Sequence, residues 1–135
     1  MGRSHPGRRV KHPSLVFDTG ALIALERADG RVRALLRRAD ELEIPIDIPA
    51  GVVAQAWRGG RQARITRLLK AERVTVVPLD DLDARAVGVL AGRSGHSDVI
   101  DVHVVVVARR AGAVVLTSDP DDIRAVDPGL RVEQV

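Results

Sequence analysis

Short apolar runs alternate along the chain with longer stretches of helical periodicity. Residues 15–17, 74–77 and 113–116 are short apolar runs bounded by turn or breaker residues, which is typical of buried strands. Residues 44–48, interrupted by Pro45, and residues 130–135 predict two further strands. The pattern therefore predicts five strands distributed over the length of the chain.

The intervening stretches predict helices. Between residues 31 and 42, the apolar positions 32, 35, 36 and 39 fall on one helical face. Residues 102–110 are rich in valine, but an acidic start and Arg109-Arg110 before Gly112 indicate a helix. Residues 92–97 predict a loop. The predicted helices span residues 21–27, 31–42, 49–57, 63–69, 80–90, 102–110 and 120–125.

Strands that alternate with helices predict an α/β fold with three layers, α/β/α, and a central parallel sheet. At 135 residues the chain is long enough for one hydrophobic core, so a single domain is expected over residues 14–135. Residues 1–13 are basic and carry no periodic pattern, and we expect them to form a disordered N-terminal arm.

Composition narrows the functional classes. Apolar residues at 45% and charged residues at 29% are ordinary for a soluble globular protein. No apolar run would span a membrane and the N-terminus lacks the apolar segment of a secretory signal, so the cytoplasm is the expected location. All 21 basic residues except Lys11 and Lys70 are arginine. Arginine suits phosphate recognition in RNA or DNA, and a coding bias toward arginine explains the excess equally well.

Four acids stand at positions where a metal-dependent nuclease would need them. Asp18 and Asp119 each follow a predicted strand, and Asp98 and Asp101 lie three apart before the valine-rich helix. Functional groups gather beyond the carboxyl ends of parallel strands, so neighbouring first and fourth strands would bring these acids together. A cation with oxygen ligands, such as Mg²⁺ or Mn²⁺, would offset their repulsion and activate water against a phosphodiester.

The same residues have a structural interpretation. Acids at such positions also cap helices or complement the helix dipole, and this role alone is predicted for Asp80, Asp81 and Asp83. Asp122 is a helix-capping candidate close enough to contribute to the pocket. A structural role is also favoured for the two weak candidates His96 and His103.

Four segments together carry a family resemblance: residues 17–24 (FDTGALIA), 55–60 (QAWRGG), 101–108 (DVHVVVVA) and 117–119 (TSD). In this order and spacing they resemble the PIN-domain ribonucleases of the VapC toxin type. The resemblance implies a PIN-like fold in which the catalytic acids Asp18, Asp101 and Asp119 hold Mg²⁺ or Mn²⁺ and RNA is hydrolysed. It also implies a homodimer and a cognate VapB-like antitoxin, as in a type II toxin–antitoxin pair.

One departure from the family pattern leaves two outcomes open. The family usually has a glutamate where this chain has Gln55, whose amide brings no negative charge. Asp98 has no place in the commonest family pattern, but it lies one helical turn from Asp101 and is a candidate replacement ligand. The chain is then either an active ribonuclease or a catalytically weakened subunit that binds antitoxin or RNA without cleaving. A receiver-like or phosphohydrolase domain is disfavoured, because Asp18 is not followed by a second acid.

Further candidates surround these acids. Gln55, Thr117, Ser118 and Asp122 are expected around the ion, where the hydroxyl groups of Thr117 and Ser118 would orient bound water or satisfy backbone groups. Arg58, Arg61 and Arg64 are expected either to steer an RNA backbone toward the pocket or to form an ordinary solvated face.

Overall fold

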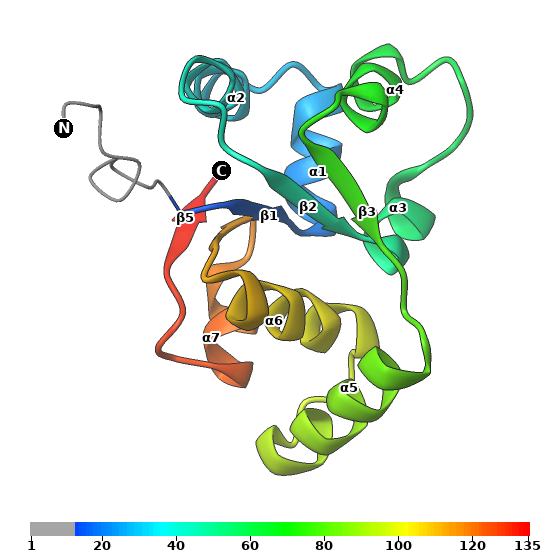
Figure 1. Ribbon diagram of the computed structural model, residues 1–135, viewed down its shortest axis with the longest axis vertical. Helices are drawn as coiled ribbons and strands as arrows, with labels where there is room; N and C mark the ends of the chain where they lie inside the picture. Colours follow the sequence, from blue (N-terminus) through cyan, green and yellow to red (C-terminus); the bar gives the residue numbers. More distant parts are fainter. Residues whose placement is uncertain (1–12) are drawn as a thin grey trace, which may run out of the picture.

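In a computed structural model that describes residues 13–135, a five-stranded sheet lies between two layers of helices (Figure 1). The strands lie in the order β3-β2-β1-β4-β5, and neighbouring strands are parallel. This confirms the predicted three-layer α/β/α fold. The predicted basic arm falls, apart from Pro13, outside the described residues. The strands are β1 (Leu15–Phe17), β2 (Ile46–Pro49), β3 (Val74–Val77), β4 (Val114–Thr117) and β5 (Val132–Gln134).

The helices divide between the two faces of the sheet. On one face α1 packs against β1 and β4 and is flanked by α2, α3 and α4, while α6 crosses β2, β1 and β4 on the other. The helix α5 packs against α6 and α7, at the outer side of that layer (Figure 1). The helices are α1 (Thr19–Glu26), α2 (Gly30–Glu41), α3 (Ala50–Ala56), α4 (Ala63–Lys70), α5 (Asp81–Ser94), α6 (Val99–Ala111) and α7 (Pro120–Val126). None of the helices in residues 13–135 is long and apolar enough to cross a membrane.

The helix α6 forms despite its valine content because most of its valines are buried in the hydrophobic core. Val102, Val105 and Ala108 are fully buried beneath the sheet, and burial outweighs their modest helix propensity. Asp98 caps its start, and Gly112 closes its end in the left-handed conformation with φ of 62°. The helix predicted over residues 102–110 is confirmed and begins three residues earlier, at Val99.

Several predicted boundaries were wrong by two or more residues, and two of them have a clear physical reason. The helix expected to end at residue 90 continues to Ser94, where Gly95 in the left-handed conformation ends it, so the loop is shorter than expected. The strand expected over residues 44–48 begins at Ile46, after Pro45, and includes Pro49. Proline cannot donate a backbone hydrogen bond, and Pro49 is accommodated as the last residue of the strand.

The helices α5 and α6 are joined by a buried carboxylate. Asp83 lies with its Oδ2 atom 2.8 Å from His103 Nε2, and it accepts two hydrogen bonds from Arg110, at 2.7 and 3.1 Å. These bonds, chiefly those from Arg110, lower the pKa of Asp83 to about 2. The interpretation of Asp83 as only a helix-dipole acid was therefore wrong, because its side chain faces the interior. The structural role predicted for His103 is confirmed.

Candidate metal centre

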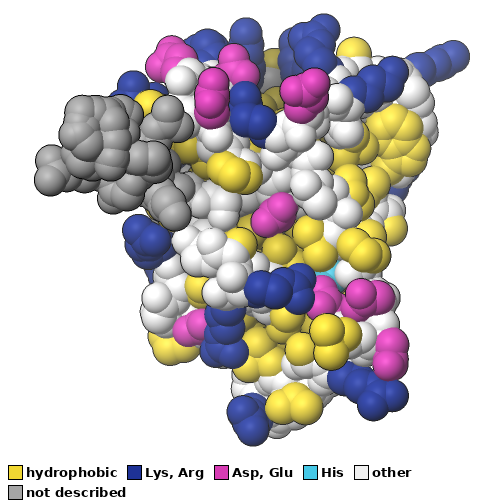
Figure 2. Space-filling model, in the orientation of Figure 1, with side chains coloured by type: hydrophobic (Ala, Val, Ile, Leu, Met, Phe, Trp, Pro, Cys, Tyr) yellow, Lys and Arg dark blue, Asp and Glu magenta, His cyan; other side chains and the backbone are white. Residues whose placement is uncertain are grey.

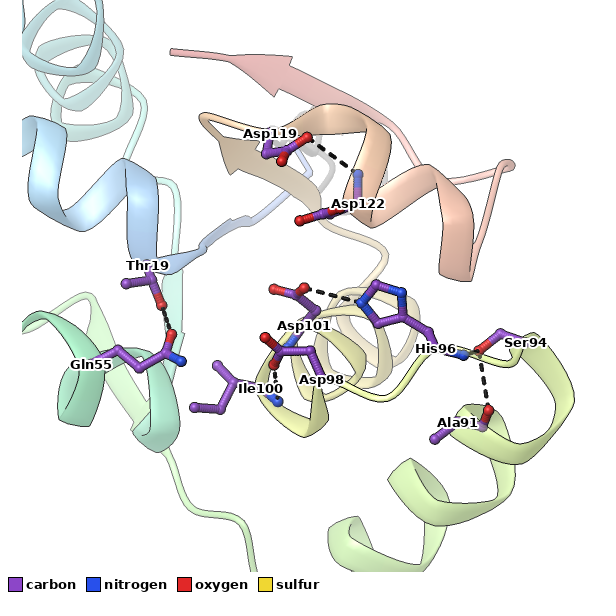
Figure 3. Close-up of polar contacts among 10 residues, drawn as sticks. All are labelled: Thr19, Gln55, Ala91, Ser94, His96, Asp98, Ile100, Asp101, Asp119 and Asp122. Carbon is purple, nitrogen blue, oxygen red and sulfur yellow. Dashed lines mark hydrogen bonds and ion pairs between the residues drawn. The ribbon is translucent and has the colours of Figure 1, made fainter.

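The predicted acids gather where β1 and β4 end side by side. These strands are paired in register from Leu15 with Val114 to Phe17 with Leu116, so Asp18 and Asp119 follow them at the same edge of the sheet. Asp101 approaches this edge from the first turn of α6, while Asp122 belongs to the first turn of α7 (Figure 3). The predicted convergence therefore depends on the direct pairing of the first and fourth strands.

Asp18 is the most buried of these acids, at 7% exposure. Its Oδ1 atom caps α1 by accepting the Ala21 N–H at 2.8 Å, and Thr117 donates a second hydrogen bond to its side chain. Burial raises the pKa of Asp18 and the charges of Asp101 and Asp119 raise it further, against the effect of the two hydrogen bonds. The carboxylate of Asp18 is thus held at a position where negative charge is already concentrated.

Asp101 and Asp122 share the same electrostatic environment. Burial raises the pKa of Asp101, a hydrogen bond from His96 lowers it, and the charges of Asp98 and Asp122 raise it. The pKa of Asp122 is raised first by the charge of Asp119. Negative charges gathered in this way favour a bound cation, because positive charge at their centre removes the repulsion.

The capping and metal-binding interpretations are compatible. Asp98 accepts the N–H groups of Ile100 and Asp101 through Oδ1, at 2.9 and 3.1 Å. Asp119 accepts the Asp122 N–H through its own Oδ1 at 3.4 Å. A carboxylate has two oxygens and about four lone-pair sites, so a cap through one oxygen leaves acceptor capacity for an ion. Several candidate ligands are therefore oriented by the helices that they cap.

The donor set fits a hard divalent cation in kind. Carboxylate oxygens are the ligands preferred by Mg²⁺ and Mn²⁺, and the mutual repulsion of these acids is what such an ion offsets. As positioned, no group of three or more His, Cys, Asp and Glu side chains within residues 13–135 is close enough to hold an ion. The acids thus form an anionic site in which the carboxylates are too far apart, as positioned, to coordinate one ion together.

Hydroxyl groups link the acids to their surroundings. The buried Thr117 accepts the Asp119 N–H at 2.9 Å through Oγ1 and also bonds Asp18, so it connects two of the acids. The exposed Ser118 lies against α1, where a Cβ added to Gly20 would be only 1.8 Å from Ser118 Oγ. The absence of a side chain at Gly20 therefore allows α1 to approach the end of β4.

Gln55 lies on α3 across from Asp98 and Asp101 (Figure 3). The Thr19 hydroxyl donates a hydrogen bond to its Oε1 atom. The helices α3 and α6 come close at Gly51, where an added Cβ would be 2.8 Å from Ile100 Cγ1. Sequence reasoning missed Thr19, although its place directly after Asp18 was the available signal.

The three predicted arginines do not form one surface. Arg58 and Arg61 lie in the exposed connection between α3 and α4, and Arg58 lines a shallow hollow together with Gln55. Arg64 is on α4, where its Nη1 atom lies 4.0 Å from Glu26 Oε2. It lines a separate groove, with an apolar floor, whose basic residues are Arg33, Arg37, Arg64, Arg67 and Arg73.

The fold and the acidic edge together define a class of α/β protein with an anionic site beyond the ends of two central strands. The model of the PIN domain family matches residues 15–128, and the chain belongs to this family. No curated protein matches the sequence.

Solved structures with the same fold include FitAcB from Neisseria gonorrhoeae, which is 20% identical, with a TM-score of 0.58, over 87% of this chain and 95% of that chain. VapBC2 from Rickettsia felis, bound to a DNA fragment from its promoter, is 15% identical, with a TM-score of 0.64, over 90% and 98% of the two chains. DNA-bound VapBC from Salmonella typhimurium is 17% identical, with a TM-score of 0.64, over 91% and 98%.

Proposed function

We propose that this protein is a metal-dependent endoribonuclease that acts as the toxin of a type II toxin–antitoxin pair. The observation that carries the proposal is the arrangement of Asp18, Asp101 and Asp119, three acids from separate elements in one electrostatic environment. Such a cluster is costly unless a cation occupies it, which supports a functional role over a structural one.

Asp18, Asp101 and Asp119 would hold the ion, with Asp98 as a further ligand that supplies the charge missing at Gln55. Mg²⁺ or Mn²⁺ bound there would activate water and neutralise charge on the phosphodiester. The hydrogen bond from Thr117 orients Asp18, and the exposed Ser118 directly follows the strand that ends at Thr117.

We assign the RNA contacts to the arginines in and near the hollow that contains Gln55. Arg58 lines the hollow beside Gln55 and is the foremost candidate for a phosphate contact, and the neighbouring Arg61 is exposed. Arg64 is held toward Glu26, so we assign it a weaker role in steering the RNA backbone.

We further propose a VapB-like antitoxin and a second copy of this chain as partners. The structures of similar fold are named VapBC, VapBC2 and FitAcB, which supports the proposal that an antitoxin binds this chain. Figure 2 shows Lys and Arg side chains interspersed with Asp and Glu at the top, and apolar side chains flanked by Lys and Arg side chains at the bottom, over α5. On α5, Leu82 and Val89 are 74% and 55% exposed, which supports a contact between copies.

A binding subunit without cleavage is the second candidate function, and Gln55 favours it. The amide is neutral and its carbonyl oxygen already accepts the Thr19 hydroxyl, so it contributes less to a metal site than a carboxylate would. In that case the acidic site would bind an ion weakly and RNA would be bound without being cut.

An RNA cleavage assay with and without Mn²⁺ distinguishes the two functions. The nuclease proposal expects the wild type to cleave only with the ion, Asp101→Asn to be inactive, and Gln55→Glu to retain or increase activity. Asp81→Asn is a matched control, since its side chain is 81% exposed on α5. Cleavage that appears only in Gln55→Glu would favour the binding subunit. Cleavage by Asp101→Asn at the wild-type rate would refute the proposed site.

A further inference from the structure

His96 occupies a fixed position in the turn between α5 and α6. The helix α5 ends at Ser94, and Gly95 reverses the chain with φ of 71°. The His96 N–H then donates to Ser94 Oγ at 3.3 Å, and that hydroxyl lies 3.5 Å from the Ala91 carbonyl oxygen (Figure 3). The backbone that carries the imidazole is thus anchored to the last turn of α5.

The imidazole points into the acidic site. Its Nε2 atom lies 3.1 Å from Asp101 Oδ2, and the two side chains are only 19% and 23% exposed. A hydrogen bond partly withdrawn from water is stronger than a surface one. The His96 side chain therefore connects the end of α5 to the acidic site and does not point into the solvent.

The hydrogen bond between His96 and Asp101 constrains the Asp101 side chain, which would otherwise be free to rotate. Asp101 is held by its backbone, whose N–H donates to Asp98, but a carboxylate in the first turn of a helix has several accessible rotamers. His96 contacts one oxygen, while the other points away from the imidazole (Figure 3). Groups that hydrogen-bond a ligating side chain fix its orientation, and their loss typically weakens metal affinity 10–100-fold.

We propose that His96 is a positioning residue that orients the Asp101 carboxylate toward a divalent cation. The inference rests on the proposed metal site and adds to it a residue outside the acids themselves. His103, on the same helix as Asp101, has no such role because it is turned toward Asp83 in the interior.

The test is Mn²⁺ binding by the full chain, measured by calorimetry and by the electron paramagnetic resonance signal of free Mn²⁺. His96→Ala should weaken Mn²⁺ binding about 10–100-fold. His96→Gln should restore most of the affinity, because the glutamine amide donates from a position close to that of Nε2. Ser97→Ala, an exposed neighbour, should bind Mn²⁺ as the wild type does. All three variants should keep the wild-type Tm.

The outcomes separate this inference from the proposed function. If Asp101→Asn loses Mn²⁺ binding while His96→Ala keeps it, the positioning role is overturned and the metal site stands. Loss of affinity in both His96→Ala and His96→Gln would overturn the hydrogen-bonding argument. A His96→Ala variant that loses Mn²⁺ only because it unfolds would also overturn it. Absence of Mn²⁺ binding by the wild type would refute the proposed function together with this inference.

Discussion

Replacing Asp83 by asparagine removes the buried charge that joins α5 to α6. The Asp83 side chain is 5% exposed, so solvent screens its bond to the buried His103 only weakly, whereas Arg110 is 53% exposed and its bonds to Asp83 are partly screened. Its pKa of about 2, against the usual 3.8 of an aspartate, corresponds to about 2–3 kcal/mol at about 1.4 kcal/mol for each pKa unit, and solvent screening at the half-exposed Arg110 reduces this to about 2 kcal/mol. We expect Asp83→Asn to lower the free energy of unfolding at pH 7 by about this amount, and we expect a larger loss in Asp83→Ala, which leaves a buried partner unpaired.

The pH dependence gives an independent check. The folded-state pKa lies below the unfolded-state pKa, so the stabilisation is fully present above about pH 4 and is lost as the pH falls toward about 2. Urea unfolding at pH 7, 5, 4 and 3 should therefore show a difference in the free energy of unfolding between wild type and Asp83→Asn. This difference should become smaller only as the pH falls below about 4. Asp81→Asn, two residues earlier on α5 and 81% exposed, is the control and should show no comparable gap. Equal midpoints of wild type and Asp83→Asn at pH 7, or a gap independent of pH, would refute the reasoning.

Three shorter predictions concern the acidic edge. Because burial raises the pKa of Asp18, its ionised form opposes folding at neutral pH, so Asp18→Asn should abolish RNA cleavage yet raise Tm; an unchanged or lower Tm contradicts this. Gly20→Ala should destabilise the fold by about 1–3 kcal/mol, because its Cβ would overlap Ser118, and Ser118→Gly in the same chain should restore the urea midpoint. Gln55→Glu should tighten Mn²⁺ binding in calorimetry by adding a negative charge, and unchanged affinity would place residue 55 outside the proposed metal site.

Local sequence patterns were sufficient to predict the fold class and most of the helices and strands. The apolar runs and helical periodicity depend on local spacing, and the acidic start with a terminal Gly112 identified α6 despite its valines. Asp18 and Asp119 were recognisable because they follow, directly or within three residues, apolar runs that fold as neighbouring strands. These features depend only on residues that are close together in the sequence, so local spacing and capping preferences are enough to predict them.

Contacts between side chains of different helices and strands depend on how these elements pack and could not be predicted from local patterns. Asp83 reads as one of three acids at a helix start, and only the packing of α5 on α6 turns it toward Arg110, 27 residues later. His96 reads as a loop histidine, and the turn at Gly95 places its ring on Asp101. Periodicity specifies which face of a helix is buried, but the partner of a polar group depends on how two helices cross. The positions of the acids relative to the predicted strands and helices can therefore be read from the sequence, whereas the contacts that each acid makes depend on the packing of the helices and strands.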